Sequence, residues 1–438
     1  MKQRKFLSVL MSVLVFIVMI ASLFSGCKKS TSNDSGSSSA KKVKITILNS
    51  KNEIQVPFES GVKEFQKKYP NIEVSVSLCP AGQSPFEKLS SMTASGNAPA
   101  IAIIDGGDLP KFESNCVDLS GEKWVSDAQN GMLDDTKSKD GKIIAFPLTV
   151  EGYGVMYNKT VLDKAGVDPA SIKTRKDFEA ALKKVKESLG TEPLELSPMD
   201  WSLGNHFLPV GYVTQDKDSA KIDDFIKGLK SGSVKLSSNT ALNGVFDTFD
   251  MMKNYNRGKK DPLASTYEQG AAVIAKGTVG FWFMGNWAWP EITKTSANAD
   301  LGFIPLPISD NAADYGNSQI AAGVTKFAFV DKSQNNADQQ KAAKDFLNWL
   351  VYDDAGQKLM VEKAAIVPAF KNITLEPADP LGKSLKKYMN DNKTLKFMSS
   401  LPADHWKVLG ADFQKYFAGR EKRDEFCTSI EKYWKNQK

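Results

Sequence analysis

Two kinds of hydrophobic period alternate along most of the chain. Apolar residues alternate with polar ones over 43–47, which is the period of a half-buried strand. Over 54–69 they recur every three or four positions, as on one face of a helix, and a second alternation fills 72–78. A short helix over 85–94 and the apolar run 101–104 continue the series. Strands interleaved with helices favour an α/β fold whose parallel sheet carries helices on both faces.

The same alternation resumes further along the chain. The further strands that we expect are 143–147, 155–157, 279–284, 301–306 and 324–330. Thr174 and Asp177 form a capping signal ahead of a helix face that runs to Leu189. More helices are expected around 342–351 and over most of 381–438. Because 438 residues are too many for one small domain, the simplest architecture is two α/β lobes of comparable size.

The amino terminus has the organisation of an export signal. A basic MKQRK segment precedes an uncharged run over 6–24, and the LFSGC sequence that ends at Cys27 resembles a bacterial lipoprotein box. The resemblance implies a signal peptide over 1–26, followed by a lipidated Cys27 and a Ser-rich tether over 27–41. This would anchor the protein on the outer face of the bacterial cytoplasmic membrane. An uncleaved anchor is the alternative, and it gives the same topology because the basic end stays inside.

Charge and histidine content bear on the function classes. Lys and Arg number 57 against 51 Asp and Glu, a net charge of +6, and three of the bases lie in the first five residues. The remaining excess of about +3 is too dilute for a nucleic-acid footprint, so we expect no nucleic-acid partner. With two histidines and no CxxC, HExxH or EF-hand spacing, we also expect no metal site and no cofactor.

Three cysteines follow Cys27, an odd number for an exported protein. They are Cys79, Cys116 and Cys427. A Cys79–Cys116 disulfide is one option, and isolated free thiols are the other, since three cysteines form no disulfide framework.

Eight segments, in order along nearly the whole chain after the export signal, carry a family resemblance. They are ITILNSKNE, FESGVKEFQKKYPNIEVSV, SSMTASGNAPAIAIIDGGD, TVEGYGVMYNKTVLDKAGV, VGFWFMGNWAWPEI, LGFIPLPI, KAAKDFLNWLVYDDAGQ and LPADHWKVLGADFQKYFAG. Together they resemble the extracellular solute-binding proteins of sugar ABC importers, in the maltose-binding-protein-like group. The family commonly has Asp where this chain has Ala100, which leaves Asp105 and Asp108 as the polar groups of that loop.

The resemblance implies a two-lobed periplasmic-binding-protein-like clamshell with a hinge, in which the chain crosses between the lobes more than once. We expect lobe 1 to hold 42–148 plus 318–362, and lobe 2 to hold 150–316 plus 366–438. The implied function is that of a monomeric binding component, not an enzyme. It would capture a di- or oligosaccharide between its lobes and deliver it to the permease subunits of an ABC transporter in the membrane.

A sugar site needs aromatic rings for the C–H faces of a pyranose and polar partners for its hydroxyls. The resemblance assigns the aromatic role to Trp287 in GNWAWP and Trp406 in PADHW, and more loosely to Trp201 in SPMDWSLG. The tryptophans that we expect to fill the core instead are Trp282, Trp349 and Trp434.

Four acids are predicted as partners of the hydroxyls. Glu53 follows the first strand at the carboxyl end of the sheet, where open α/β folds bind ligands, and Lys51 is an alternative at the same place. Asp105 ends the third strand in the same geometric position. Glu151 matches a cleft carboxylate of the family and should lie near the cleft floor, and Asp200 precedes one of the tryptophans. For each acid, a solvated loop residue or helix cap is the alternative.

Three further residues and two rival functions remain open. Tyr153 and Tyr212 could add contacts, whereas His405 is expected on the rim or in a structural role. A surface glycoside hydrolase would also need two acids beside aromatic rings. No nucleophile elbow, Walker loop, dinucleotide fingerprint or zinc spacing supports an enzyme. A binding protein for a non-sugar solute, such as a peptide or an iron complex, is the other alternative.

Overall fold

The structure is a computed structural model that describes residues 42–437 except 81, 130 and 400. The predicted signal peptide, Cys27 and the tether lie outside the described residues, so the expectations for them stay predictions. Within the described residues, no helix is both long enough and apolar enough to cross a membrane.

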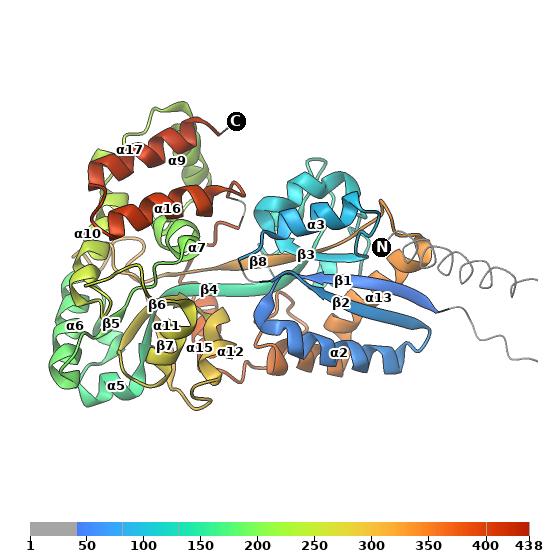
Figure 1. Cartoon of the computed structure of the whole chain (residues 1–438), viewed down its shortest axis with the longest axis horizontal. Helices are drawn as coiled ribbons and strands as arrows, with labels where there is room; N and C mark the ends of the chain where they lie inside the picture. Colours follow the sequence, from blue (N-terminus) through green and yellow to red (C-terminus); the bar gives the residue numbers. More distant parts are fainter. Residues whose placement is uncertain (1–41, 81, 130, 400, 438) are drawn as a thin grey trace, which may run out of the picture. The chain divides into compact units, whose positions relative to one another are not determined.

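A mixed sheet organises the described chain (Figure 1). Its strands are β1 (Val43–Asn49), β2 (Ile72–Leu78), β3 (Ile101–Asp105), β4 (Phe146–Asn158), β5 (Leu194–Glu195), β6 (Phe281–Gly285), β7 (Leu301–Ile304), β8 (Ile320–Val330) and β9 (Thr394–Lys396). The order is β2-β1-β3-β8-β4-β6-β5, with β7 beside β4 and β9 beside β8. β1 is parallel to β2 and β3, as expected. β8 is antiparallel to both β3 and β4, so the expectation of a parallel sheet holds for only part of it.

Helices fill most of the connections between these strands. The α-helices are α2 (Gln55–Lys68), α3 (Pro85–Ala94), α4 (Trp124–Asp127), α5 (Lys159–Lys164), α6 (Arg175–Leu189), α7 (Asp200–Ser202), α8 (Leu208–Val213), α9 (Ser219–Ser231), α10 (Thr240–Tyr255), α11 (Tyr267–Ala275), α12 (Trp289–Thr293), α13 (Ala337–Tyr352), α14 (Asp354–Lys358), α15 (Pro380–Asn390), α16 (His405–Phe417) and α17 (Arg423–Lys435). Short 3₁₀ segments are η1 (Asn52–Ile54), η2 (Gly106–Asn115), η3 (Asp134–Thr136), η4 (Pro169–Ser171), η6 (Leu236–Ser238) and η7 (Asn286–Ala288), and π-helical turns are η5 (Leu203–Phe207) and η8 (Leu359–Lys363). The predicted cap of α6 is confirmed, because the Asp177 N–H donates to Thr174 Oγ1 at 3.1 Å.

β4 is one continuous strand where the sequence pattern predicts two, at 143–147 and 155–157, and that prediction is wrong. The pattern breaks at residues such as Gly152. In the structure a Cβ on Gly152 would lie 2.5 Å from Leu385 Cδ1, so the glycine admits a neighbouring helix instead of ending the strand.

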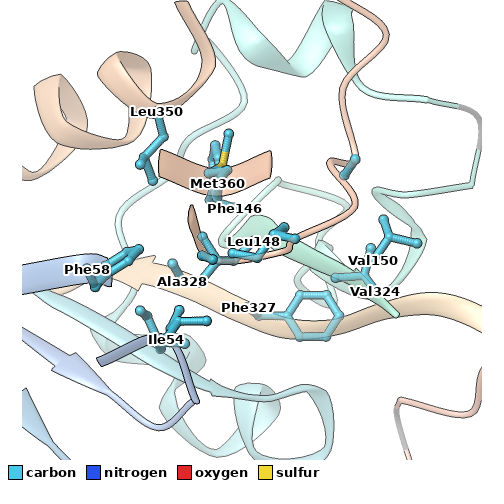
Figure 2. Close-up of a cluster of buried hydrophobic side chains, with 14 of the residues drawn as sticks. Ile54, Phe58, Phe146, Leu148, Val150, Val324, Phe327, Ala328, Leu350 and Met360 are labelled. Carbon is cyan, nitrogen blue, oxygen red and sulfur yellow. The ribbon is translucent and has the colours of Figure 1, made fainter. Parts of the chain in front are cut away.

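Buried side chains gather in two hydrophobic cores. The first surrounds β1, β3 and the start of β4 and extends to α11, β6 and α15; Figure 2 shows Phe58, Phe146 and Phe327 within it. The second is built mainly by α6, α8, α10, α16 and α17. β4 and β8 lie side by side and contribute to both cores, since Phe146 belongs to the first and Tyr153 to the second. These two strands therefore link the cores.

The cysteines and three of the tryptophans lie in these cores. Cys79, Cys116 and Cys427 are buried and free, so the option of a Cys79–Cys116 disulfide is wrong and the free-thiol alternative is confirmed. The tryptophans predicted as core residues are confirmed as such, with exposed fractions of 0% for Trp282, 2% for Trp349 and 1% for Trp434.

Candidate functional site

Charged side chains converge at the carboxyl ends of β1 and β3. Lys51 and Glu53 come directly after β1, and Asp105 is the last residue of β3. Lys51 Nζ donates to Glu53 Oε1 at 2.8 Å and also to Glu151 Oε1 on β4. Lys326 Nζ on β8 donates to Asp105 Oδ1 at 2.6 Å. We call these five residues the charged cluster; it brings together three of the four predicted acids.

The ionisation of the charged cluster follows from its pairing. Only 5% of the Lys51 side chain is exposed. This burial opposes its charge, but the carboxylates of Glu151 and Glu53 outweigh burial and raise the pKa of Lys51. Burial also opposes the charge of Glu53, yet the Lys51 ammonium holds the pKa of that carboxyl below its ordinary value. For Lys326, burial is likewise outweighed by Asp105, so its pKa is raised. Both lysines are therefore charged at neutral pH.

Aromatic side chains form a second group. The ring centroids of Trp201 on α7 and Trp287 on η7 are 6.4 Å apart, and Tyr267 at the start of α11 lies 5.9 Å from Trp201. His206 in η5 lies 4.7 Å from Trp287 and 5.6 Å from Trp201. Tyr153 on β4 lies 4.9 Å from His206. We call these five residues the aromatic cluster. All except Tyr153 are only half-buried, so they keep some exposed surface.

Tyr267 of the aromatic cluster is influenced by the charges of the charged cluster. Burial, together with the negative charges of Glu53 and Glu151, raises the pKa of Tyr267 well above its ordinary value. The charges of the two carboxylates therefore disfavour ionisation of the phenol whose ring packs on Trp201. The Tyr267 hydroxyl also donates to the main-chain oxygen of Trp287 at 3.5 Å. Since Trp287 packs against both hydrophobic cores, the site lies where the two cores meet.

Local structure holds Trp287 in place. It follows β6 and precedes α12, whose first turn contains Pro290, as the sequence predicts. Asn286 Oδ1 accepts a hydrogen bond from the Gly152 N–H at 2.9 Å, which ties η7 to β4. A Cβ on Gly285 would collide with the indole, so glycine is needed where the ring folds over its own strand.

Comparison with known proteins places this chain among binding proteins. The profile of the bacterial extracellular solute-binding protein family matches residues 50–357. The chain belongs to this family. The family resemblance seen in the sequence is thereby confirmed, and the family is one of extracellular binding proteins.

Relatives of this solute-binding protein cover most of it. It is 24% identical over 412 residues to the melibiose/raffinose/stachyose-binding protein MelE of Bacillus subtilis, with 92% of this chain and 91% of that one aligned. It is 29% identical over 367 residues to the arabinooligosaccharide-binding protein of Bacillus subtilis, with 79% of this chain and 76% of that one aligned. The solved structure of the solute-binding protein RafE in complex with raffinose matches with a TM-score of 0.74 at 17% identity, covering 90% and 99%. This likeness confirms the predicted two-lobed α/β fold.

Two predicted site residues of the solute-binding protein lie outside these contacts. Asp200 Oδ1 accepts the main-chain N–H of Trp201 at 2.8 Å, a local contact within α7. Trp406 is half-buried in the first turn of α16, and Lys407 Nζ lies 5.2 Å from its ring centroid. Within the described chain its ring makes no ring contact with the aromatic cluster. A Cβ on Gly204 would lie 2.7 Å from the Trp406 main-chain oxygen, so Trp406 is on a helix that packs on η5.

His405 and Tyr212 belong to the second core. Both are 0% exposed, and the Tyr212 hydroxyl lies 3.3 Å from His405 Nε2. Trp434 Nε1 donates to the same hydroxyl at 3.1 Å. The structural role expected for His405 is confirmed, whereas the contact proposed for Tyr212 is not supported by its burial.

Three residues of the site were missed from the sequence: Lys326, His206 and Tyr267. Lys326 carried a usable signal, because it is the one charged residue in the apolar run 324–330. His206 and Tyr267 had none beyond their residue type. In the described chain, no group of three or more His, Cys, Asp or Glu side chains could hold a metal ion.

Proposed function

We propose that this solute-binding protein captures a di- or oligosaccharide at the charged and aromatic clusters and delivers it to the permease subunits of an ABC importer. The observation that carries the proposal is the position of Tyr267, whose ring lies 5.9 Å from that of Trp201 and whose phenol is close enough to Glu53 and Glu151 for their charges to raise its pKa, so that half-buried indoles and carboxylates share one region. Indole faces suit the C–H faces of a pyranose, and the charged groups suit its hydroxyls. The sugar-binding relatives support the same ligand class.

Closure of the two lobes on the ligand is part of the proposal. The lobes, with the limits expected above, would rotate about the segments that link them. A ligand drives closure only if it binds the closed state more tightly than the open one. The two clusters support this, because Lys51 and Asp105 belong to the expected lobe 1, whereas Trp201, Tyr267 and Trp287 belong to the expected lobe 2.

We further propose that the bound sugar leaves chemically unchanged. A glycoside hydrolase needs a carboxylic acid with a raised pKa to protonate the leaving group. Glu53 and Glu151 share the Lys51 ammonium, and the pKa of Glu53 is lowered. This arrangement supports binding without cleavage.

The same proposal includes a lipid anchor at Cys27 and a monomeric protein on the outer face of the bacterial cytoplasmic membrane. The LFSGC sequence after a long apolar run supports it. Cys27→Ala should move the protein from the membrane fraction to the medium, and retention in the membrane would contradict the lipid anchor.

Calorimetry on Trp287→Ala tests the proposed function. The panel consists of melibiose, raffinose, stachyose, and arabino-, xylo- and chito-oligosaccharides. We expect wild-type protein to bind at least one of them and Trp287→Ala to bind it about tenfold more weakly or worse, the equivalent of about 1.4 kcal/mol.

Trp289→Ala is the matched control, since Trp289 is a half-buried tryptophan two residues away. It should leave the affinity nearly unchanged. Wild-type protein that binds no sugar of the panel, or that shortens one, would contradict the proposal.

A further inference from the structure

His206 lies at the centre of the aromatic cluster. Its imidazole centroid is 4.7 Å from that of Trp287, 4.9 Å from Tyr153, 5.6 Å from Trp201 and 5.9 Å from Phe397. These four rings come from separate parts of the chain, so the fold assembles them around one polar ring.

The ring nitrogens of His206 have no hydrogen-bond partner among the described residues. Nδ1 is buried and unpaired, and no described residue bonds Nε2. The other histidine shows the contrast, because His405 Nε2 lies 3.3 Å from the Tyr212 hydroxyl and His405 Nδ1 lies 3.3 Å from Asn205 Oδ1. A buried polar atom without a partner destabilises a fold, so His206 is costly as a purely structural residue.

The backbone and the protonation state at His206 also suit a ligand contact. His206 belongs to the π-helical turn η5, and such turns occur frequently at functional sites. Burial lowers the pKa of His206 to about 3, so its imidazole is neutral at physiological pH. A neutral imidazole has one nitrogen that donates and one that accepts, and a sugar hydroxyl can pair with either.

We propose that His206 is a specificity-determining residue of this sugar site, where one of its ring nitrogens hydrogen-bonds a hydroxyl of the sugar that packs on Trp287. The inference rests on the proposed function. A site built around a hydrogen bond rejects an analogue that lacks the hydroxyl, because the protein nitrogen then stays unpaired. His206 therefore selects among sugars that the indoles alone would accept equally.

Three variants separate hydrogen bonding from packing. His206→Phe keeps an aromatic ring and removes both nitrogens. The amide of His206→Asn reaches about as far as Nδ1, and that of His206→Gln about as far as Nε2. We expect His206→Phe to bind the sugar found in the panel about tenfold more weakly than wild type, and Asn or Gln to recover most of the loss.

Thermal unfolding of the same proteins gives a second readout. His206→Phe should melt at the wild-type temperature or above it, since it removes an unpaired buried nitrogen. His405→Phe should melt lower, because it breaks two hydrogen bonds. Unchanged sugar affinity in His206→Phe, or an equal loss of affinity in all three His206 variants, would overturn the inference about His206 but not the proposed function. Wild-type protein that binds no sugar would overturn both.

Discussion

At the scale of single residues, Lys51 stands out because it is buried between two carboxylates. Its Nζ donates to both Glu53 and Glu151, and only 5% of its side chain is exposed. Lys51→Met would leave these carboxylates close together without a counter-charge. We expect it to lower the free energy of unfolding by about 3–5 kcal/mol, measured by urea denaturation.

An exposed pair of the same length is the control for Lys51→Met. Lys67 Nζ lies 2.8 Å from Glu64 Oε1, as Lys51 Nζ does from Glu53 Oε1, but 71% of the Lys67 side chain is exposed. Lys67→Met should change the free energy of unfolding by no more than about 1 kcal/mol. If both variants lower the free energy of unfolding by the same amount, burial is not the reason why the Lys51 ion pair stabilises the protein.

Single residues also show how far the sequence predicts the site. Glu53 and Asp105 could be predicted because the carboxyl ends of neighbouring parallel strands meet at one edge of a sheet. Lys326, the partner of Asp105, stands out as the one charged residue of an apolar run, but its pairing could not be predicted, because it arrives on an antiparallel strand from a distant part of the chain. His206 and Tyr267 were missed for a similar reason, since the contacts that give them a role join segments far apart in sequence.

At the scale of elements, hydrophobic periodicity placed helices well and long strands less well. The expected helix over 85–94 matches α3, which spans Pro85–Ala94. β8 begins at Ile320, four residues before the expected start of its strand. Its early part includes Gly323, where a Cβ would lie 2.8 Å from Phe397 Cβ. Where close packing requires a small residue such as glycine, the alternation of apolar and polar residues is interrupted, and the strand cannot be recognised from it.

The close approach at β4 leads to a prediction about Gly152. A Cβ at this position would lie 2.5 Å from Leu385 Cδ1 and 2.8 Å from the main-chain oxygen of Ala321, and the backbone cannot move away without disturbing the sheet. We expect Gly152→Ala to destabilise the protein by about 1–3 kcal/mol, measured by urea denaturation.

Gly121→Ala is the matched control for Gly152→Ala. No heavy atom lies within 4 Å of a Cβ built on Gly121, and its backbone needs no left-handed conformation. Its free energy of unfolding should stay the same or rise slightly, because alanine restricts the unfolded chain. If Gly121→Ala lowered the free energy of unfolding as much as Gly152→Ala does, the close approach of Leu385 would not explain the destabilisation by Gly152→Ala.

At the scale of the whole molecule, the net charge of +6 is a poor guide to the charge of the ligand. In the charged cluster, each lysine is already paired with a carboxylate, and two ammonium groups face three carboxylates. A uronic acid would bring another carboxylate to this set without a free cation in the cluster to receive it. Provided that the protein binds a sugar as proposed, the charged cluster therefore favours a neutral one.

Charge selection can be measured with the best-binding oligosaccharide and its C6-carboxylate derivative, which differ by one ionised group. We expect the carboxylate to bind at least about tenfold more weakly at pH 7. Glu53→Gln should reduce this difference in affinity, because the Lys51 ammonium then has one carboxylate fewer and can attract the ligand. Glu64→Gln, which removes the carboxylate of an exposed pair, should not change the difference. Equal or tighter binding of the carboxylate by wild-type protein would mean that a lysine of the charged cluster leaves its partner to meet the ligand. The ion pairs that Lys51 and Lys326 form with their carboxylates would then exist only in the unliganded protein.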